Sequence, residues 1–261
     1  MVEALVHDPG VVRTRLSTRP SDKMPEGVQW VQQMVVGQPV SAVLRHGKRL
    51  AWVFEGEDRG VLLHLGMTGK WVFHDTLPQH KSLRCSLRLE GGGWLCFLDT
   101  RRFGCLVPCE ENLSGALAAG LGMDAYSAAL TAEGLMETMQ VHRPLKVALM
   151  DQRLLAGLGN IHAVEILWKA QLHPLARSRN LEKHHWARLA RVIPAHLEEV
   201  LASEKGDEIV YMNEGRQSNP FAVYQRSGQA CSRCFDKIIS LKVQGRSTFL
   251  CPGCQEMAGR P

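Results

Sequence analysis

The chain has 261 residues, of which 45% are hydrophobic, so we expect two domains with a modest core each and no large disordered region. The net charge of +5 weakly favours polyanionic partners. Many ordinary enzymes have a similar charge, so by itself it identifies no partner. No long apolar run and no signal-peptide pattern occur, which argues against a membrane-spanning or secreted protein and predicts a soluble, cytoplasmic one. We also expect it to be a monomer.

Residues 41–109 have the two-residue periodicity of β-strands. The stretch "SLRCSLRL" (82–89) alternates polar and apolar residues, "EGGG" forms a turn and "WLCFL" returns, which predicts a hairpin within an antiparallel sheet. Two earlier stretches, "SAVLRHGKRLAWVFE" (41–55) and "GVLLHLGMTGKWVF" (60–73), are strand-like and interrupted by a glycine. We therefore expect two more strands with tight bends or bulges.

After the small-residue segment 111–128, which we interpret as the crossing between domains, the periodicity changes to 3.6. The stretch "LKVALMDQRLLAG" (145–157) predicts a helix that ends at Gly157, and "IHAVEILWKA" (161–170) predicts a second helix after a sharp turn. A longer helix is expected over 181–203 with a kink at Pro194, followed by a loop over 205–222.

The eight cysteines fall into two groups of four. The first group lies at irregular intervals in strand-like stretches, where small buried thiols are the simplest interpretation: Cys85, Cys96, Cys105 and Cys109. The second group forms two CxxC pairs with sixteen residues between them, the spacing of a tetrahedral zinc site: Cys231, Cys234, Cys251 and Cys254. Such a small module needs the metal to fold, so one structural Zn²⁺ is predicted here.

The cysteine module is basic, with five cationic residues against Asp236 between positions 226 and 246. This excess favours a finger that faces nucleic acid, although a purely structural zinc knuckle stays open as an alternative. The cationic residues are Arg226, Arg233, Lys237, Lys242 and Arg246.

Two further motifs suggest DNA contacts. "LDTRRFG" (98–104) places Arg101 and Phe103 after a strand, where an aromatic wedge beside guanidinium groups could enter a base stack, with Met67 of "HLGMTG" as a second wedge. In "GLGN" (157–160), Asn160 and the amides of the following helix could bind a phosphate. Taken singly, the arginines could be solvated surface residues and the glycines a helix cap.

Five motifs together resemble the formamidopyrimidine-DNA glycosylase and endonuclease VIII family, more closely its formamidopyrimidine branch. They occur in that family's order between about residues 5 and 256: "RHGKRL", "HLGMTG", "DTRRFG", "LMDQRLLAGLGNIHAVEIL" and "VQGRSTFLCPGC". The resemblance implies an α+β protein in four parts. These are an antiparallel β-sandwich domain (1–112), a linker (113–127), a helical domain with a helix-two-turns-helix (128–222) and a four-cysteine zinc-finger β-hairpin (223–261).

The resemblance also implies an activity and a set of site residues. The expected enzyme flips a damaged base out of duplex DNA, cuts its glycosidic bond and nicks the strand, and its preferred lesion stays open among oxidised purines. Lys48 resembles the lysine that contacts phosphate and assists elimination, and Arg246 resembles the finger arginine that clamps phosphate. The implied DNA contacts are His80, Arg101, Lys146 and Asn160, and the implied wedges are Met67 and Phe103.

One element of the family pattern is not matched. Members begin, after removal of Met, with a proline and a glutamate at the head of a helix, and the terminal amine forms an imine with the sugar. Here "MVEALVHDPGVV" resembles the strand after that helix, so we expect either that the chain starts after the helix or that Val2 with Glu3 replaces the pair. Two alternatives therefore stay open: a non-catalytic protein that binds damaged or abasic DNA, and a zinc-ribbon protein that binds RNA.

Overall fold

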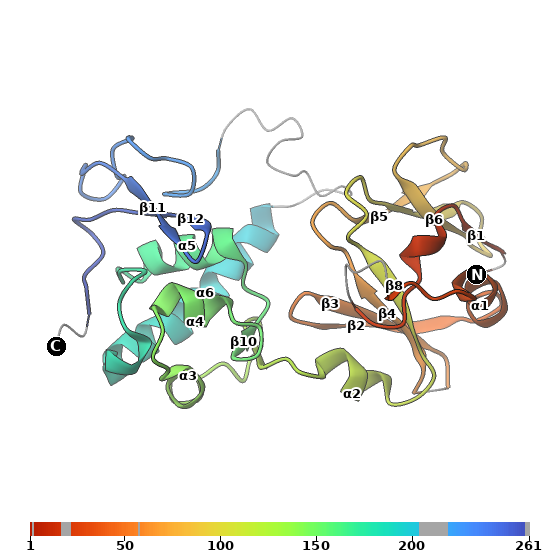
Figure 1. Ribbon diagram of the computed structural model, residues 1–261, viewed down its shortest axis with the longest axis horizontal. Coiled ribbons are helices and arrows are strands. Elements are labelled where there is room, and N and C mark those ends of the chain that lie inside the picture. Colours follow the sequence, from red (N-terminus) through yellow and green to blue (C-terminus); the bar gives the residue numbers. More distant parts are fainter. Residues whose placement is uncertain (2, 17–21, 57, 204–218, 259–261) are drawn as a thin grey trace. The chain divides into compact units, whose positions relative to one another are not determined.

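The computed structural model describes residues 1, 3–16, 22–56, 58–203 and 219–258 (Figure 1). The chain divides into two compact units, Met1–Ala119 and Gly120–Pro261. The first is built from β-sheets and the second mainly from helices, and each has its own hydrophobic core. The predicted α+β class is confirmed, whereas the finer division into four parts stays a prediction.

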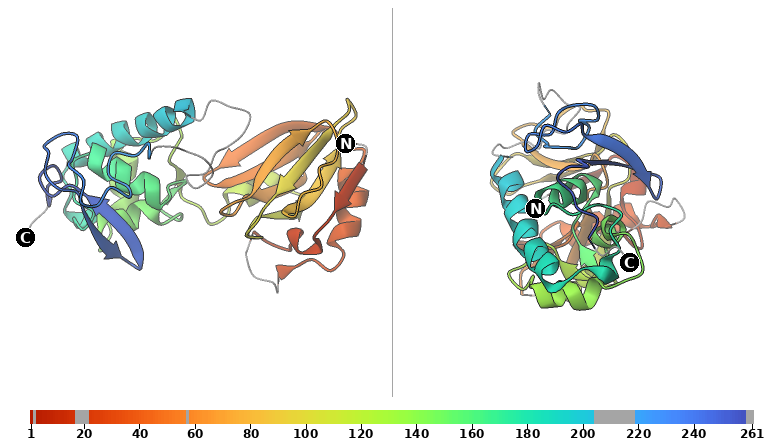
Figure 2. Two further views of the ribbon diagram at one scale, coloured as in Figure 1. Left: turned by 90° about the horizontal axis from the view of Figure 1, so that it is seen from above. Right: turned by 90° about the vertical axis from the view of Figure 1, so that its left-hand side faces the viewer.

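The first unit contains two four-stranded sheets, in which neighbouring strands are all antiparallel. Their strand orders are β1-β6-β7-β5 and β2-β3-β4-β8, and the two layers can be followed in the orange and yellow ribbons of Figure 2. The bounds are β1 (Glu3–Val6), β2 (Val40–His46), β3 (Arg49–Phe54), β4 (Gly60–His64), β5 (Lys70–His74), β6 (Leu83–Arg88), β7 (Trp94–Leu98) and β8 (Cys105–Cys109). Apolar side chains from both sheets form one core, as a sandwich requires.

The hairpin predicted over 82–98 is confirmed as β6 and β7. The prediction of two bent strands over 41–73 is wrong, because the structure has four strands there. The glycines mark turns rather than bulges. Gly47 (φ 58°) joins β2 to β3, and Gly66 (φ 70°) lies between β4 and β5. A positive φ of this size is a backbone conformation that ends a strand and that glycine adopts without strain.

Two helical segments cover the sheets of the first unit. Helix α1 (Gly27–Trp30) continues into a π-helical turn (Val31–Val35) and buries Trp30 in the core between the sheets. Helix α2 (Leu113–Ala118) packs Leu113 and Leu117 against the other face of the β2-β3-β4-β8 sheet. The segment interpreted as a crossing between domains thus begins with a helix that belongs to the first unit.

The second unit is built around α3 (Ala132–Met139), α4 (Leu145–Met150), α5 (Asn160–Lys169) and α6 (Lys183–Ser203), with a short parallel pair β9 (Met123–Asp124) and β10 (Leu155–Ala156). The long helix predicted around Pro194 is confirmed as α6. The helix predicted over 145–157 is wrong beyond Met150. There, Asp151 accepts the amides of Arg153, Leu154 and Leu155 with its side chain and its carbonyl, which replaces the helical pattern by a turn.

Strands β11 (Ile239–Val243) and β12 (Arg246–Leu250) form the predicted hairpin, with Gln244 and Gly245 as its two-residue turn. In the blue part of Figure 2 this hairpin lies against the green helices of the same unit. The loop predicted over 205–222 falls largely on residues 204–218, which lie outside the described residues. Within the described ranges, no helix is both long enough and apolar enough to cross a membrane.

Candidate functional site

The first unit brings the three predicted wedge residues together on two turns. Met67 lies in the turn between β4 and β5, which we call the methionine turn (65–69), and its side chain is exposed. Arg101 and Phe103 lie between β7 and β8, in the arginine turn (99–104), and the Arg101 guanidinium is 4.9 Å from the centre of the Phe103 ring. A Cβ atom at Gly66 would come within 2.8 Å of the Phe103 carbonyl carbon, so the two turns pack against each other.

Asp99 fixes the arginine turn from inside. Its Oδ1 accepts the Thr68 hydroxyl at 2.6 Å and the Arg101 amide at 3.1 Å, and its Oδ2 accepts the Gly104 amide at 2.7 Å. Because Thr68 belongs to the methionine turn, a single buried carboxylate joins both turns. Sequence reasoning found Arg101 and Phe103 and missed Asp99, although an Asp is typical of turns in which its side chain accepts the amide two residues further on, as here.

The first unit also places the other predicted residues near strand ends. Lys48 lies in the β2–β3 turn, and His80 precedes β6, where its ring nitrogen accepts the Ser82 amide. His64, at the end of β4, was not predicted. Burial, and then the charges of Lys48 and neighbouring arginines, lower the pKa of His64, which keeps this ring neutral and able to accept the Gly66 amide. His64 is the first residue of the "HLGMTG" motif, so this motif could have indicated it.

In the second unit, Lys146, Asn160 and Arg246 meet at the hairpin. The Lys146 Nζ lies 2.6 Å from the Thr248 hydroxyl, and Asn160 Nδ2 donates to the Ser247 carbonyl at 3.0 Å. Both donors hold β12 onto helices α4 and α5. A cavity beside them is lined by three cationic side chains and one carboxylate, together with uncharged residues. The charged residues are Arg143, Lys146, Arg246 and Asp151. This arrangement suits an anion such as a phosphate.

Burial, and then the charge of Arg246, lower the pKa of Lys146 to about 8 from its ordinary value of 10.5. The side chain is 1% exposed, so the charged form is costly in the folded state. The role of Lys146 as a phosphate ligand stays a prediction, but its amine already has a partner in the hairpin.

The wild-type protein should become more stable as the pH rises above about 8, and replacing Lys146 by methionine should remove this increase. Because the unfolded chain binds this proton more tightly, the cost of burying the charge is present in full below pH 8 and is relieved as the pH rises to about 10.5. The free energy of unfolding of the wild-type protein should therefore rise by about 1 to 3 kcal/mol over this window, relative to Lys146→Met. Thermal denaturation across the window measures this, with the exposed Lys183→Met as control. Parallel wild-type and Lys146→Met curves would contradict it.

Helix α5 holds the finger at two more points. The buried Glu165 carboxylate accepts the backbone amides of Ala222, Val223 and Tyr224 at 2.8 to 3.0 Å. One turn further on, the Arg233 guanidinium stacks 3.8 Å above the Trp168 ring. The finger therefore shares an apolar cluster with the helix that carries Asn160.

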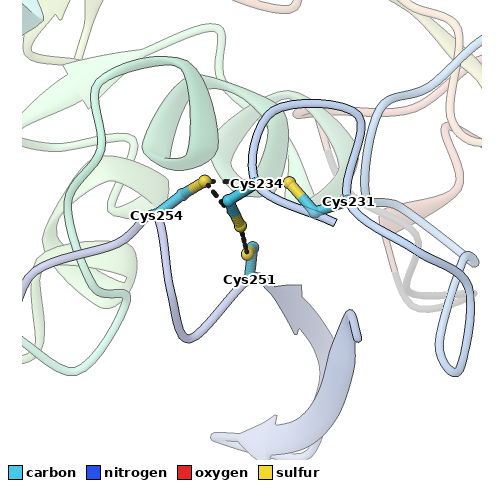
Figure 3. A group of neighbouring side chains, drawn as sticks. All are labelled: Cys231, Cys234, Cys251 and Cys254. Carbon is cyan, nitrogen blue, oxygen red and sulfur yellow. Dashed lines mark hydrogen bonds between the residues drawn. The ribbon is translucent and has the colours of Figure 1, made fainter. Parts of the chain in front are cut away.

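The four cysteines of the second group converge from two loops, as Figure 3 shows. All four Sγ atoms lie within 4.8 Å of one another, and their separations include 3.7 Å for Cys231–Cys254 and 3.3 Å for Cys234–Cys251. Sulfurs that bind one tetrahedral zinc at about 2.3 Å are about 3.8 Å apart. The cluster therefore fits a metal ion with four thiolate ligands. In the first group, Cys85, Cys96 and Cys105 are buried, and Cys109 is half-buried.

The structure thus gathers two sets of predicted residues, one in each unit. The first unit holds the wedge residues on their joined turns, and the second holds the cations beside the hairpin and the four-cysteine cluster. Val2, the possible terminal nucleophile, lies outside the described residues.

Comparison with known proteins agrees with this arrangement. Two family models match, the formamidopyrimidine-DNA glycosylase N-terminal domain over residues 3–106 and the formamidopyrimidine-DNA glycosylase H2TH domain over residues 121–210. A formamidopyrimidine-DNA glycosylase of Chloroflexus aurantiacus is 32% identical over 234 residues, which cover 87% of this chain and 84% of that protein.

Two solved structures are similar over 98% of this chain and 92% of theirs. The complex between the Lactococcus lactis Fpg and an abasic site containing DNA has a TM-score of 0.81 at 25% identity. A structure of MutM in complex with carbocyclic 8-oxo-G containing DNA has a TM-score of 0.82 at 26% identity. By the length and identity of these matches, the chain belongs to the formamidopyrimidine-DNA glycosylase family.

Proposed function

We propose that this protein is a DNA glycosylase with abasic-site lyase activity, which removes oxidised purines such as 8-oxoguanine and formamidopyrimidine from duplex DNA in base-excision repair. The observation that carries the proposal is the joined pair of turns that presents Met67, Arg101 and Phe103 together. Relatives of known structure hold abasic or 8-oxo-G containing DNA, which supports damaged duplex DNA as the partner. The protein would act as a monomer on nucleoid DNA in the cytoplasm.

The wedge residues have the chemistry to replace an extruded base. Flipping a base out of the stack costs a few kcal/mol, and apolar side chains that fill the gap reduce this cost. Met67 supplies a flexible apolar side chain that is 57% exposed, and Phe103 supplies an aromatic ring. Arg101, stacked on that ring, can hydrogen-bond the base left without a partner.

The second unit would supply the phosphate contacts. The exposed Arg246 lines the basic cavity, and Asn160 begins helix α5, whose N-terminal end favours an anion such as a phosphate. Lys146 and the metal cluster would hold the hairpin so that Arg246 keeps its position. A structural Zn²⁺ bound by the four cysteines supplies folding free energy rather than chemistry at the lesion.

The lyase step would pass through an imine between a protein amine and the opened sugar, after which base-catalysed elimination breaks the strand. Lys48, in the β2–β3 turn, is the residue proposed to contact phosphate near the sugar and to assist elimination. His80 is proposed as a further backbone contact.

The activity can be tested with duplex oligonucleotides that contain 8-oxoguanine or an abasic site. We expect strand cleavage at both lesions, no cleavage of the undamaged duplex, and a covalent adduct when borohydride reduces the imine. Lys48→Ala should slow nicking of the abasic duplex by roughly 10²-fold or more, as loss of a group that acts in the transition state does. Lesion binding without cleavage or trapping would instead indicate a non-catalytic binding protein.

A further inference from the structure

A buried ion cluster lies behind the arginine turn. The Arg84 guanidinium, on β6, has a side chain that is 3% exposed, and its Nε lies 2.8 Å from Asp8 Oδ2. Its Nη1 lies 3.9 Å from Asp99 Oδ2, the oxygen that accepts the Gly104 amide. Neither nitrogen makes a hydrogen bond within the described residues, so both contacts are electrostatic. Arg84 thus stands between two carboxylates, one of which fixes the arginine turn.

The same cluster continues to the outer side of the turn. Arg102 has a positive φ of 58°, and its guanidinium lies 3.6 Å from Asp8 Oδ2. Its carbonyl accepts the guanidinium of Arg13 at 3.1 Å. Asp8 and Arg13 belong to the segment after β1, so this segment contacts both the side chain and the backbone carbonyl of Arg102. A non-glycine residue at positive φ is held there only when its surroundings determine its conformation.

The charges explain why Arg84 is needed. The Asp99 side chain is 0% exposed and accepts three hydrogen bonds, two at Oδ1 and one at Oδ2. A buried carboxylate is costly unless a cation is near it. Arg84 is the cation within the described residues that reaches Asp99, and a guanidinium stays protonated despite burial.

We propose that Arg84 is a positioning residue for base extrusion, which places a positive charge beside the buried Asp99 side chain and thereby fixes the turn from which Arg101 and Phe103 project. Arg84 acts through Asp99 and Asp8, without contact to DNA or to the wedge side chains. This inference rests on the proposed function, because it assumes that the fixed turn takes part in recognising the lesion.

The test compares Arg84→Gln with the wild-type protein by two measurements. Amide hydrogen exchange should be faster by about tenfold or more at Arg101 and Gly104, because their acceptor loses its charge balance; a tenfold change corresponds to about 1.4 kcal/mol. Affinity for an abasic duplex should fall roughly tenfold, while affinity for an undamaged duplex, which phosphate contacts dominate, stays unchanged. Arg84→Lys, which keeps the charge but loses the planar fork, should lie between the two.

Arg88→Gln is the matched control, because Arg88 lies on the same strand, is half exposed and pairs with Glu3 at 3.9 Å. It should change neither measurement. A folded Arg84→Gln variant with wild-type exchange at Arg101 and Gly104 would overturn the proposal. If Arg84→Gln does not fold, the Arg84→Lys variant tests the proposal instead. Wild-type amide exchange and wild-type lesion affinity in Arg84→Lys would then overturn the proposal. If the wild-type protein shows no preference for the abasic duplex, the proposed function fails, while amide exchange still decides the role of Arg84.

Discussion

Replacing Cys251 by serine should release the bound metal and unfold the hairpin β11–β12. Structural zinc contributes apparent free energies of about 10 to 16 kcal/mol to small finger modules, more than the finger can obtain from its few buried side chains. Cys251 is fully buried, directly follows β12 and shares an apolar cluster with Val164 and Trp168 of α5. Loss of the ion should therefore loosen the contact with α5 as well, and affinity for a lesion duplex should fall by about 100-fold or more.

Metal content by mass spectrometry and hydrogen exchange over residues 239–250 measure the two effects. The matched control is Cys109→Ser, because Cys109 is a half-buried thiol of the first group, outside the cluster. It should keep one equivalent of zinc and normal exchange. A Cys251→Ser protein that retains stoichiometric zinc would contradict the four-cysteine ligand set.

The fold was predictable where the sequence has a strict period or a fixed spacing. The alternation over 82–98 predicted β6 and β7, and the two CxxC pairs predicted the convergence of four thiols. Both signals are local, because each depends on residues close in sequence. The same local reasoning mistook turns for bends at Gly47 and Gly66, since a glycine inside an apolar stretch is compatible with either.

In the first unit, the wedge residues were predictable from the sequence, but the buried residues that hold their turns were not. Arg101 and Phe103 stand out in a motif, whereas Arg84 lies in an alternating strand where a polar position is expected to face solvent. Its burial follows from Asp8, which is 76 positions away, and no local pattern encodes this pairing. The hydrogen bonds of Glu165 to residues 222–224 are unpredictable for the same reason.

Replacing Arg246 by alanine should weaken binding to every duplex while the metal stays bound. Arg246 begins β12 and lines the basic cavity, but it is not a metal ligand. If it clamps one phosphate, its loss should lower affinity by about 10 to 100-fold and reduce the slope of log affinity against log salt by about 1. The charge of Arg246 also lowers the pKa of Lys146, so the variant should raise that pKa and leave Lys146 more fully protonated at neutral pH.

Fluorescence anisotropy at several salt concentrations measures the slope, and metal content is measured on the same samples. Lys242→Ala is the matched control, since Lys242 is an exposed cation on the facing strand and does not line the cavity. Its affinity loss should be smaller, because an exposed cation without a fixed partner contributes mainly long-range attraction that salt screens. An Arg246→Ala variant with an unchanged salt slope would remove this residue from the phosphate contacts. Equal losses in both variants would instead attribute the effect to the net charge of the finger, rather than to a clamp at one phosphate.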